Sequence, residues 1–251
     1  MKKKIFIILA IIFITCLVLY ASAGYYVAKS ILKIDPTCGW HEDSLPNNWS
    51  TAVDAHEYSN LSRSRLRESF PSSEYHLKQW QNIYFPSREE GVQLNGWLFN
   101  YYENRPIVII VHGIFPNGKC KPESNLIASL LINQGINAFT IDLRNYGQSD
   151  TTSDYEDLGL KSFNDVLGAY DFLKQIGFKG REIGLHGISL GAVPVIFAAN
   201  AEPDIQAIWL DSSLVEFNMV LKDEIARYGL SIEFGPAVSF FGQLLAGVDP
   251  T

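Results

Sequence analysis

Hydrophobic and polar positions change period several times after residue 80, and each period predicts a different element. Residues 81–87 and 92–99 are rich in β-branched and aromatic side chains and are separated by the turn residues REEG, which predicts an antiparallel hairpin. Continuous apolar runs predict buried strands at 106–113, 137–147, 182–187 and 206–213. Apolar residues at helical spacing predict helices at 125–135, 162–177 and 189–200. This alternation predicts an α/β fold with a mostly parallel, doubly wound sheet and helices on both faces.

The first apolar segment has a different character, because residues 5–28 contain no charged side chain. At about 1.5 Å per helical residue, this run is long enough to cross a hydrocarbon core of about 30 Å. Lys2, Lys3 and Lys4 precede it and are expected to stay in the cytoplasm, which places the rest of the chain on the extracytoplasmic side of a single-pass anchor. The alternative is a signal peptide cleaved near Ala23, with secretion of the remainder.

Composition divides the chain into three predicted parts. Residues 1–28 form the anchor or signal peptide, and residues 29–79 form a polar stalk with one or two short helices. Residues 80–251 form the α/β domain. No internal repeat or low-complexity tract interrupts these parts.

Charge and cysteine content narrow the functional classes. The formal net charge of −7 and the absence of a basic stripe beyond the N-terminus argue against a nucleic-acid partner, which would need a basic surface. No HExxH, paired cysteines, GxGxxG or GxxxxGK occurs in a suitable place, so neither a metal nor a nucleotide cofactor is expected. Cys16, Cys38 and Cys120 are too few for a disulfide scaffold, although Cys38 and Cys120 could pair in an oxidising compartment.

The clearest candidate chemistry lies in HGISLGAVP, where the predicted strand 182–187 meets the predicted helix 189–200. Gly187-Ile188-Ser189-Leu190-Gly191 fits a GxSxG nucleophile elbow, a turn so tight that small residues are needed two positions either side of the serine. The turn exposes the Ser189 hydroxyl, and the amides at the start of the following helix favour a developing negative charge. Ser189 is therefore the predicted nucleophile.

A second segment supports this interpretation. His112 and Gly113 follow the strand at 106–111, at the place from which the second amide of an oxyanion hole comes in such an arrangement. The amides of Leu190 and Ile114 are the predicted donors, with Phe115 as the alternative to Ile114. The ring of His112 is expected to hold its loop rather than to act as a base.

Four segments in order, VIIVHGIFPNG, AFTIDLRNYGQSD, IGLHGISLGA and AIWLDSS, resemble those of α/β-hydrolases. The version that the chain most resembles is the membrane-anchored or exported serine hydrolases related to dienelactone-hydrolase-like and serine-aminopeptidase-like enzymes. The resemblance covers roughly Trp80 to the end. It implies a Ser, His and Asp triad that works through an acyl-enzyme on a carboxylic ester, amide or peptide, with no cofactor.

The turn DLRNYGQSD resembles the family's DxRGxGxS turn. Asn145 stands where the family usually has glycine. Asp142 and Arg144 are interpreted as residues that hold this turn, not as catalysts.

The general base is missing from its usual place. In this fold the triad runs serine, then acid, then histidine, yet all five histidines precede Ser189: His41, His56, His76, His112 and His186. His186 ends a buried strand and is expected to be a core histidine. Asp211 follows the last predicted strand and is a candidate acid, with a plain strand-end aspartate as the alternative. The strands that would complete the sheet after this one are also absent, so the strand 206–213 is expected at or near a sheet edge.

Three hypotheses follow from the missing histidine. The first is a membrane-anchored serine hydrolase whose sequence is truncated at its C-terminus. The second is an inactive, hydrolase-like module that binds a carbonyl or carboxylate ligand or a protein at the membrane. The third is that a partner chain supplies the missing strands and histidine through the exposed sheet edge. The reactivity of Ser189 toward a phosphonate probe discriminates the first hypothesis from the second.

Overall fold

The chain forms two compact units in a computed structural model that describes residues 2–34, 44–50, 70–113, 118–213 and 217–247. The smaller unit combines Met1–Lys33, Tyr155–Asp157 and Val215–Thr251. The larger unit combines Ile34–Asp154 and Leu158–Leu214. The chain thus leaves the smaller unit after its first helix, touches it again at Tyr155–Asp157 and returns to it at Val215.

The larger unit is built on a six-stranded, mostly parallel sheet with the strand order β1-β2-β4-β3-β5-β6. The first two strands form the predicted antiparallel hairpin, β2 is antiparallel to β4, and the remaining neighbours are parallel. The strands are β1 (Gln81–Pro86), β2 (Gln93–Phe99), β3 (Ile107–Val111), β4 (Asn137–Asp142), β5 (Ile183–Ile188) and β6 (Ile208–Asp211). The helical elements are η1 (Ser72–Tyr75), α2 (Pro122–Asn133), α3 (Phe163–Gln175), η2 (Gly180–Glu182), η3 (Ser189–Gly191) and α4 (Ala192–Ala201). The predicted α/β fold is confirmed.

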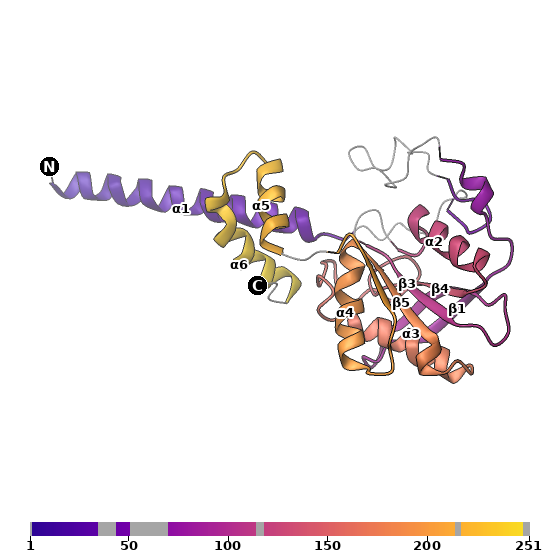
Figure 1. The fold of residues 1–251 in the computed structure, drawn as a ribbon. Coiled ribbons are helices and arrows are strands. Elements are labelled where there is room, and N and C mark those ends of the chain that lie inside the picture. Colours follow the sequence, from indigo (N-terminus) through magenta and orange to yellow (C-terminus); the bar gives the residue numbers. More distant parts are fainter. Residues whose placement is uncertain (1, 35–43, 51–69, 114–117, 214–216, 248–251) are drawn as a thin grey trace. The chain divides into compact units, whose positions relative to one another are not determined.

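Helices cover both faces of this sheet (Figure 1). Ile109 and its register partner Phe139 face the core that includes side chains of α3 and α4. Ile110, one position further along β3, faces the opposite core, to which α2 contributes Ala128 and Ile132. Successive strand residues point to opposite faces, so a strand covered on both sides must be apolar throughout, as the continuous run at 107–111 is.

Strand β6 is the outermost strand on its side of the described sheet. Its Ile208 and Trp209 side chains are 46% and 66% exposed, which is unusual for apolar residues of a strand next to a buried one. The predicted position of this strand at a sheet edge is confirmed. Such an edge offers unpaired backbone groups together with apolar side chains, the combination that favours pairing with another strand.

The described residues of the smaller unit form four helical elements: α1 (Lys2–Leu32), α5 (Phe217–Arg227), η4 (Ile232–Phe234) and α6 (Gly235–Ala246). Helix α1 is long and apolar enough to cross a membrane, and its large apolar side chains from Ile5 to Leu19 are exposed. Its last turns are different, because Gly24, Val27, Ala28 and Leu32 are buried. Val27 and Ala28 belong to a small core with Leu221 and Ile225 of α5 and Val238 of α6.

These units divide the chain differently from the parts predicted by composition. Of the residues expected as stalk, the described ones at 44–50 and 70–79 group with the sheet, and Trp49 is almost fully buried. Residues 215–251, expected in the α/β domain, group instead with α1. The short helices expected around residues 51–70 lie almost wholly outside the described residues.

Candidate active site

Ser189 stands at the turn between β5 and α4. Strand β5 ends at Ile188, and η3 begins with Ser189 and leads directly into α4. The backbone of Ser189 has φ +53°, a left-handed conformation that costs a residue with a side chain of order 1–3 kcal/mol. Such strain is maintained only where the surrounding structure fixes it. The side chain is half-buried, as expected for a hydroxyl presented at the top of a sheet.

Two glycines make this turn sterically feasible. A Cβ on Gly187 would lie 2.5 Å from the Ala192 Cα and 2.6 Å from the Gly191 carbonyl oxygen. A Cβ on Gly191 would meet the His112 carbonyl oxygen and would lie 2.6 Å from that of Val111. Every one of these neighbours is a backbone atom, which cannot swing aside as a side chain can. Gly187 is therefore required by the close approach of β5 to the start of α4, and Gly191 by the close approach of the elbow to the end of β3.

The segment that follows β3 also lies against the elbow. A Cβ on Gly113 would be 2.8 Å from the Ile188 carbonyl oxygen and 3.0 Å from the Ser189 Cβ. The chain from β3 therefore passes directly beside the serine. Ile114 and Phe115, the predicted alternatives for one oxyanion donor, lie outside the described residues. Leu190, the other predicted donor, is in the first turn of a helix, where backbone N–H groups have no acceptor within the helix.

His112 is held in its neutral form by two hydrogen bonds. Its Nδ1 lies 2.8 Å from the Gly113 carbonyl oxygen, and its Nε2 lies 3.2 Å from the Leu143 backbone nitrogen. A carbonyl only accepts and an N–H only donates, so Nδ1 carries the proton and Nε2 accepts. Burial lowers the pKa of His112 to about 4, against weaker opposing effects from the Gly113 hydrogen bond and the Asp142 charge. Both ring nitrogens are engaged, which suits a role in holding the loop.

This protonation state makes stability depend on pH. The folded-state pKa lies below the unfolded value of 6.5, so the stabilisation is complete above pH 6.5 and is lost as pH falls toward the folded value. As pH falls from 7 to 5, the contribution of His112 should lower the free energy of unfolding by about 2 kcal/mol. Urea unfolding of the wild-type chain and a His112→Asn variant measures this. Equal losses in the two proteins over that pH interval would contradict it.

The other described histidines are also placed away from a catalytic role. His186 lies within β5 opposite Trp209 of β6, and burial lowers its pKa while the Asp211 charge opposes that shift. His76 Nε2 lies 2.9 Å from the Trp49 carbonyl oxygen. His41 and His56 lie outside the described residues. Within the described part of the chain, no hydrogen bond reaches the Ser189 hydroxyl.

Asp211 ends β6 beside the elbow. Its register partner on β5 is Ile188, the residue directly before Ser189. The carboxylate is half-buried, and its Oδ1 accepts a hydrogen bond of 3.0 Å from the Ser212 hydroxyl. Ser212 has φ +52°, so the chain turns sharply here as well. The structure thus brings Asp211 to the same end of the sheet as Ser189, but it shows no base between them in the described residues.

Comparison with known proteins agrees with this geometry. A family model described as the alpha/beta hydrolase fold matches residues 106–248. The chain belongs to the α/β-hydrolase fold family. The match includes β3, the elbow and β6, the elements that position the candidate site.

This α/β hydrolase is similar to several solved structures. An esterase from Pyrococcus furiosus matches with a TM-score of 0.57 and 21% identity, covering 74% of this chain and 69% of that one. The alpha/beta hydrolase GrgF from a Penicillium species matches with a TM-score of 0.50 and 20% identity, covering 69% of this chain and 57% of that one. These likenesses support the fold.

A curated relative matches by sequence. It is the thiohydrolase aneE of Aspergillus aculeatus, 29% identical over 128 residues. The matched stretch spans 51% of this chain and 40% of that protein. Less than half of the relative is therefore represented in the comparison.

A buried ion pair in this α/β hydrolase ties the loop after β3 to the end of β4. Lys119 and Asp142 form it with both side chains almost fully buried, and the Lys119 ammonium lies 4.9 Å from the centre of the Trp97 ring. Asp142 also accepts hydrogen bonds from the backbone N–H groups of Lys119 (2.7 Å) and Gln148 (3.1 Å). Asp142 thus fixes segments on both sides of it. Sequence reasoning missed Lys119, because it stands in a polar stretch typical of exposed loops.

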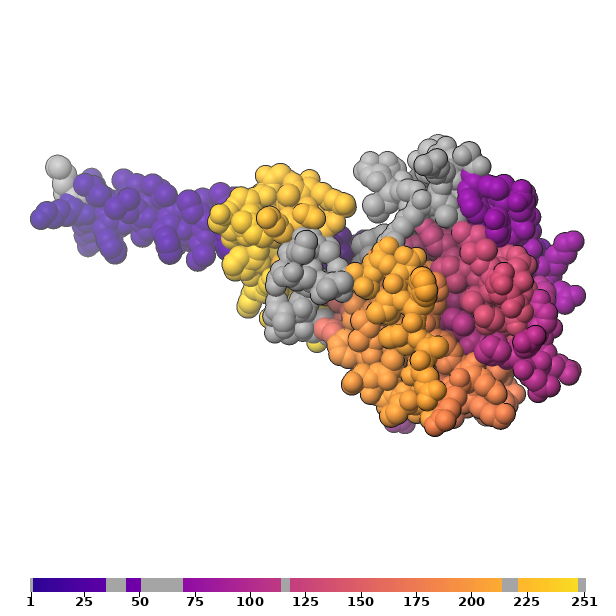
Figure 2. Space-filling view, viewed as in Figure 1, coloured from indigo at the N-terminus to yellow at the C-terminus, as the bar shows by residue number. Residues whose placement is uncertain are grey.

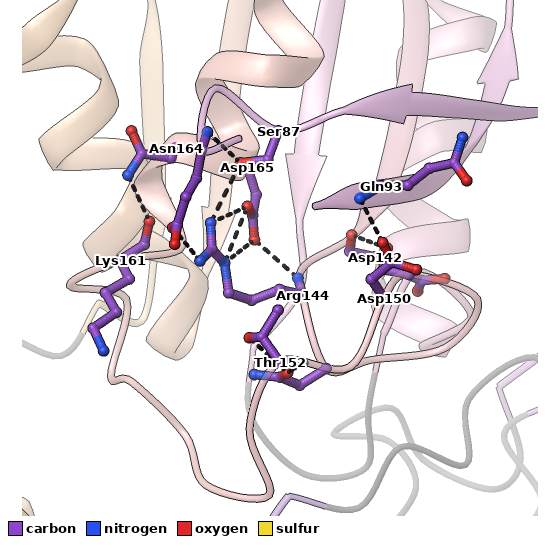
Figure 3. A network of polar contacts seen from close by, with 12 residues as sticks. Ser87, Gln93, Asp142, Arg144, Asp150, Thr152, Lys161, Asn164 and Asp165 are labelled. Carbon is purple, nitrogen blue, oxygen red and sulfur yellow. Dashed lines mark hydrogen bonds and ion pairs between the residues drawn. The ribbon is translucent and has the colours of Figure 1, made fainter. Parts of the chain in front are cut away.

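The turn after β4 in the α/β hydrolase is fixed by a second buried pair (Figure 3). Asp165 of α3 accepts from the Arg144 backbone N–H at 2.9 Å and from the Arg144 guanidinium through Nε (3.0 Å) and Nη2 (2.7 Å). The guanidinium also pairs with Glu89, in the turn between β1 and β2. Arg144 therefore joins three parts of the chain.

Asn145 has a conformational reason to replace the usual glycine of this α/β hydrolase turn. Its φ is +70°, a region that asparagine tolerates better than most residues with a side chain. Its Oδ1 accepts hydrogen bonds from the backbone N–H groups of Thr152 (2.6 Å) and Ser153 (2.9 Å). The side chain therefore closes the turn in a way that glycine cannot.

The sequence predicts that this α/β hydrolase has no metal site, and the structure describes only part of the chain. Within that part, no cluster of three or more His, Cys, Asp or Glu side chains is arranged to hold a metal ion. Cys16 is free and exposed on α1, whereas Cys120 is disulfide-bonded. Cys38 lies outside the described residues, so the predicted pair with Cys120 stays a prediction.

Proposed function

We propose that this chain is a membrane-anchored serine hydrolase that cleaves a carboxylic ester, amide or peptide through an acyl-enzyme on Ser189. The observation that carries the proposal is the strained turn at Ser189, held between β5, α4 and the end of β3 by glycines that tolerate no side chain. Strain of this kind collects at functional sites. Membership of the α/β-hydrolase fold family supports it, as do similar proteins named as an esterase and a thiohydrolase.

The proposed chemistry has two halves. The Ser189 Oγ attacks the substrate carbonyl carbon and gives its proton to a base, and the resulting oxyanion is stabilised by the Leu190 N–H and, as predicted from sequence, by the Ile114 N–H. Collapse of this intermediate expels the protonated leaving group and leaves an ester on Ser189. Water then hydrolyses that ester and restores the hydroxyl. Asp211 is the proposed acid that would orient the base.

The proposed location follows from α1. Residues 5–28 cross the membrane, Lys2, Lys3 and Lys4 stay on the cytoplasmic side, and the larger unit acts on the extracytoplasmic side. The length and hydropathy of α1 support this anchor. Cleavage near Ala23 is the alternative, and it would remove most of the exposed apolar surface of the helix.

A second candidate function rests on one observation. In the described residues, no histidine is bonded to Ser189, and His112 has both ring nitrogens occupied. Without a base, a serine hydroxyl is a weak nucleophile. The alternative is therefore a non-catalytic module that binds a carbonyl or carboxylate ligand at the elbow.

Labelling by a fluorophosphonate probe tests the proposal. The full chain is treated in its native membranes and after detergent purification, and the modified peptide is identified by mass spectrometry. We expect labelling on Ser189 that is lost completely in a Ser189→Ala variant, because the probe reacts with activated serines.

The outcomes separate the hypotheses. No labelling in either preparation would contradict a serine hydrolase and favour the binding module. Labelling that occurs in membranes but disappears on purification would indicate that a partner chain supplies the base, consistent with a partner at the exposed edge of β6.

A further inference from the structure

Helix α6 packs against α1 in the smaller unit, and Figure 2 shows the yellow C-terminal atoms lying against the indigo helix. A Cβ on Gly24 would meet the Cβ of Ala237 and would lie 3.0 Å from its carbonyl carbon, so the two backbones are in close contact. The Tyr20 hydroxyl donates a 2.8 Å hydrogen bond to the Glu233 carbonyl, at the start of η4 and α6. Small residues at a helix contact allow this approach, as they do between helices in membranes.

The contacts also set the direction of α6 along α1. The ring of Tyr20 stacks on Phe234 at 5.1 Å, and the ring of Tyr25 meets Phe241 edge-on at 5.5 Å. The two helices therefore run parallel, with residue numbers that increase in the same direction along each. Helix α6 therefore begins beside Tyr20 and continues in the direction in which α1 leaves its exposed apolar part.

This position corresponds to the outer boundary of a bilayer crossed by α1. A hydrocarbon core of about 30 Å takes about 20 helical residues. Counted from Ile5, those residues end near Gly24, which contacts α6. Tyr20, Tyr25 and Tyr26 lie around the same level, and tyrosine is the residue type enriched where a membrane meets water.

Exposed apolar side chains run along η4 and α6, next to the exposed Glu233 of η4. Ile232, Pro236, Phe240 and Leu244 are all exposed and stand four residues apart, which places them along one side of the helix. Phe240 and Leu244 are 62% and 69% exposed. Residues 234–247 contain no charged side chain. We call these four residues the α6 stripe.

Helix α5 shows the opposite distribution. Its Leu221 and Ile225 are buried in the core of the smaller unit, whereas Lys222, Asp223 and Arg227 are exposed. The exposed side of α5 thus carries charged residues, whereas α6 contains no charged residue. A helix that is apolar on its packed side and on its exposed side is suited to lipid rather than to water.

We propose that the α6 stripe is inserted into the extracytoplasmic leaflet of the same bilayer that α1 crosses, at the boundary between hydrocarbon and headgroups. The inference rests on the proposed anchor and goes beyond it, because it assigns the lipid leaflet as the partner of a second helix. The arguments for lipid are the start of η4 and α6 beside Tyr20, within the part of α1 that is long enough to cross a membrane, and the absence of charged residues from 234 to 247. The membrane contact then consists of a transmembrane helix and a helix seated at the surface beside it.

Spin-label accessibility on the full chain tests this proposal in phosphatidylcholine vesicles. Phe240→Cys and Leu244→Cys are labelled separately in a Cys16→Ala background, with Lys222→Cys on α5 as the matched exposed control. Collision rates with lipid-soluble oxygen and with a water-soluble nickel chelate are compared. We expect the oxygen-to-nickel ratio to exceed one at positions 240 and 244 and to fall below one at position 222.

A label on native Cys16, which is free and exposed on α1, reports on the anchor alone. If that label is not in lipid, the proposed anchor fails. If it is in lipid but labels at 240 and 244 meet mainly nickel, the α6 stripe faces water and this inference is overturned. Exclusion of both reagents at 240 and 244 would also overturn it, because the stripe would then be covered by the larger unit or by a second copy. Leu244 provides an independent position should Phe240→Cys disturb the ring contact with Phe241.

Discussion

Replacing Gly191 with alanine should destabilise the larger unit by about 3 kcal/mol or more and abolish labelling of Ser189. The added Cβ would meet the His112 carbonyl oxygen and would lie 2.6 Å from that of Val111. Both atoms belong to the backbone at the end of β3, which is paired on both sides in the sheet. The clash can therefore be relieved only by moving β3 and the elbow apart, and that movement would displace the Ser189 hydroxyl from the amides that favour its chemistry.

Gly184→Ala is the matched control, because Gly184 lies in the same strand as the elbow but its Cβ would have no neighbour closer than 3.5 Å. Urea unfolding followed by tryptophan fluorescence measures both variants. All five tryptophans of the chain fall within the larger unit, so this signal reports on the unit that contains the substitution. A Gly191→Ala chain as stable as Gly184→Ala, with normal labelling, would show that the elbow is not constrained as described.

Replacing Arg144 with methionine should cost the larger unit about 3–5 kcal/mol at pH 7, the range typical of a buried ion pair that loses one partner. The substitution keeps the length of the side chain but leaves the buried Asp165 carboxylate without its counter-charge. Arg144 also joins α3 to the β1–β2 turn through Glu89, so a second contact is lost at once. Urea unfolding at pH 7 measures the difference.

The pH dependence of the stability deficit distinguishes loss of the Arg144 charge from loss of its packing contacts. Burial raises the pKa of Asp165, and the hydrogen bonds and charge of Arg144 oppose that rise. Without Arg144 the folded-state pKa moves further up, so the folded variant binds a proton more readily than the unfolded one. Its deficit relative to wild type should therefore shrink as pH falls from 7 to 5.

Arg181→Met provides the control for this experiment. Arg181 pairs with Asp204 at 3.8 Å with both side chains largely exposed, so its loss should cost less than about 1 kcal/mol. A similar cost for the two arginine variants, or a deficit of Arg144→Met that does not change with pH, would contradict the assigned role of the buried pair.

Local sequence patterns were sufficient to predict the sheet because each strand carries its own signal. The run at Ile107–Val111 is apolar at every position, as a strand covered on both faces must be. The hairpin follows from two strand-like runs separated by a short polar turn. The elbow at Ser189 could be predicted because the strand, the two glycines and the helix are adjacent in sequence, so no long-range contact is needed to recognise this turn.

Patterns of this kind do not identify partners that are distant in sequence. Ser162 and Asp165 have the spacing of a capping box, and Ser162 is the N-cap of α3. No side-chain cap forms, because the Ser162 backbone is itself helical, and the Asp165 carboxylate binds Arg144. Lys119 is buried only because Asp142 and Trp97 face it across the sheet. Nothing in the residues around Lys119 indicates these neighbours.

The same limit applies to the C-terminal helices. The sequence predicts a helix around 215–229, and α5 occupies Phe217–Arg227. Which surface its apolar side covers depends on α1, a segment whose composition suggests contact with lipid alone. The small residues Gly24 and Ala237 were the available signal, and small residues are too common to identify a contact without a structure.

The hydrogen bond from Tyr20 to Glu233 joins residues that are 213 positions apart, and this separation has a consequence for biosynthesis. Helix α1 leaves the ribosome before the larger unit, and its packing partners α5 and α6 leave after that unit. At rates of about 5–20 residues per second, that interval lasts on the order of ten seconds or more, and domains generally fold as units during synthesis. The sheet therefore has time to fold while α1 still waits for α5 and α6. Association of these helices therefore follows folding of the sheet, and a ribosome that stalls before it releases residue 217 leaves a folded sheet on an unpartnered helix.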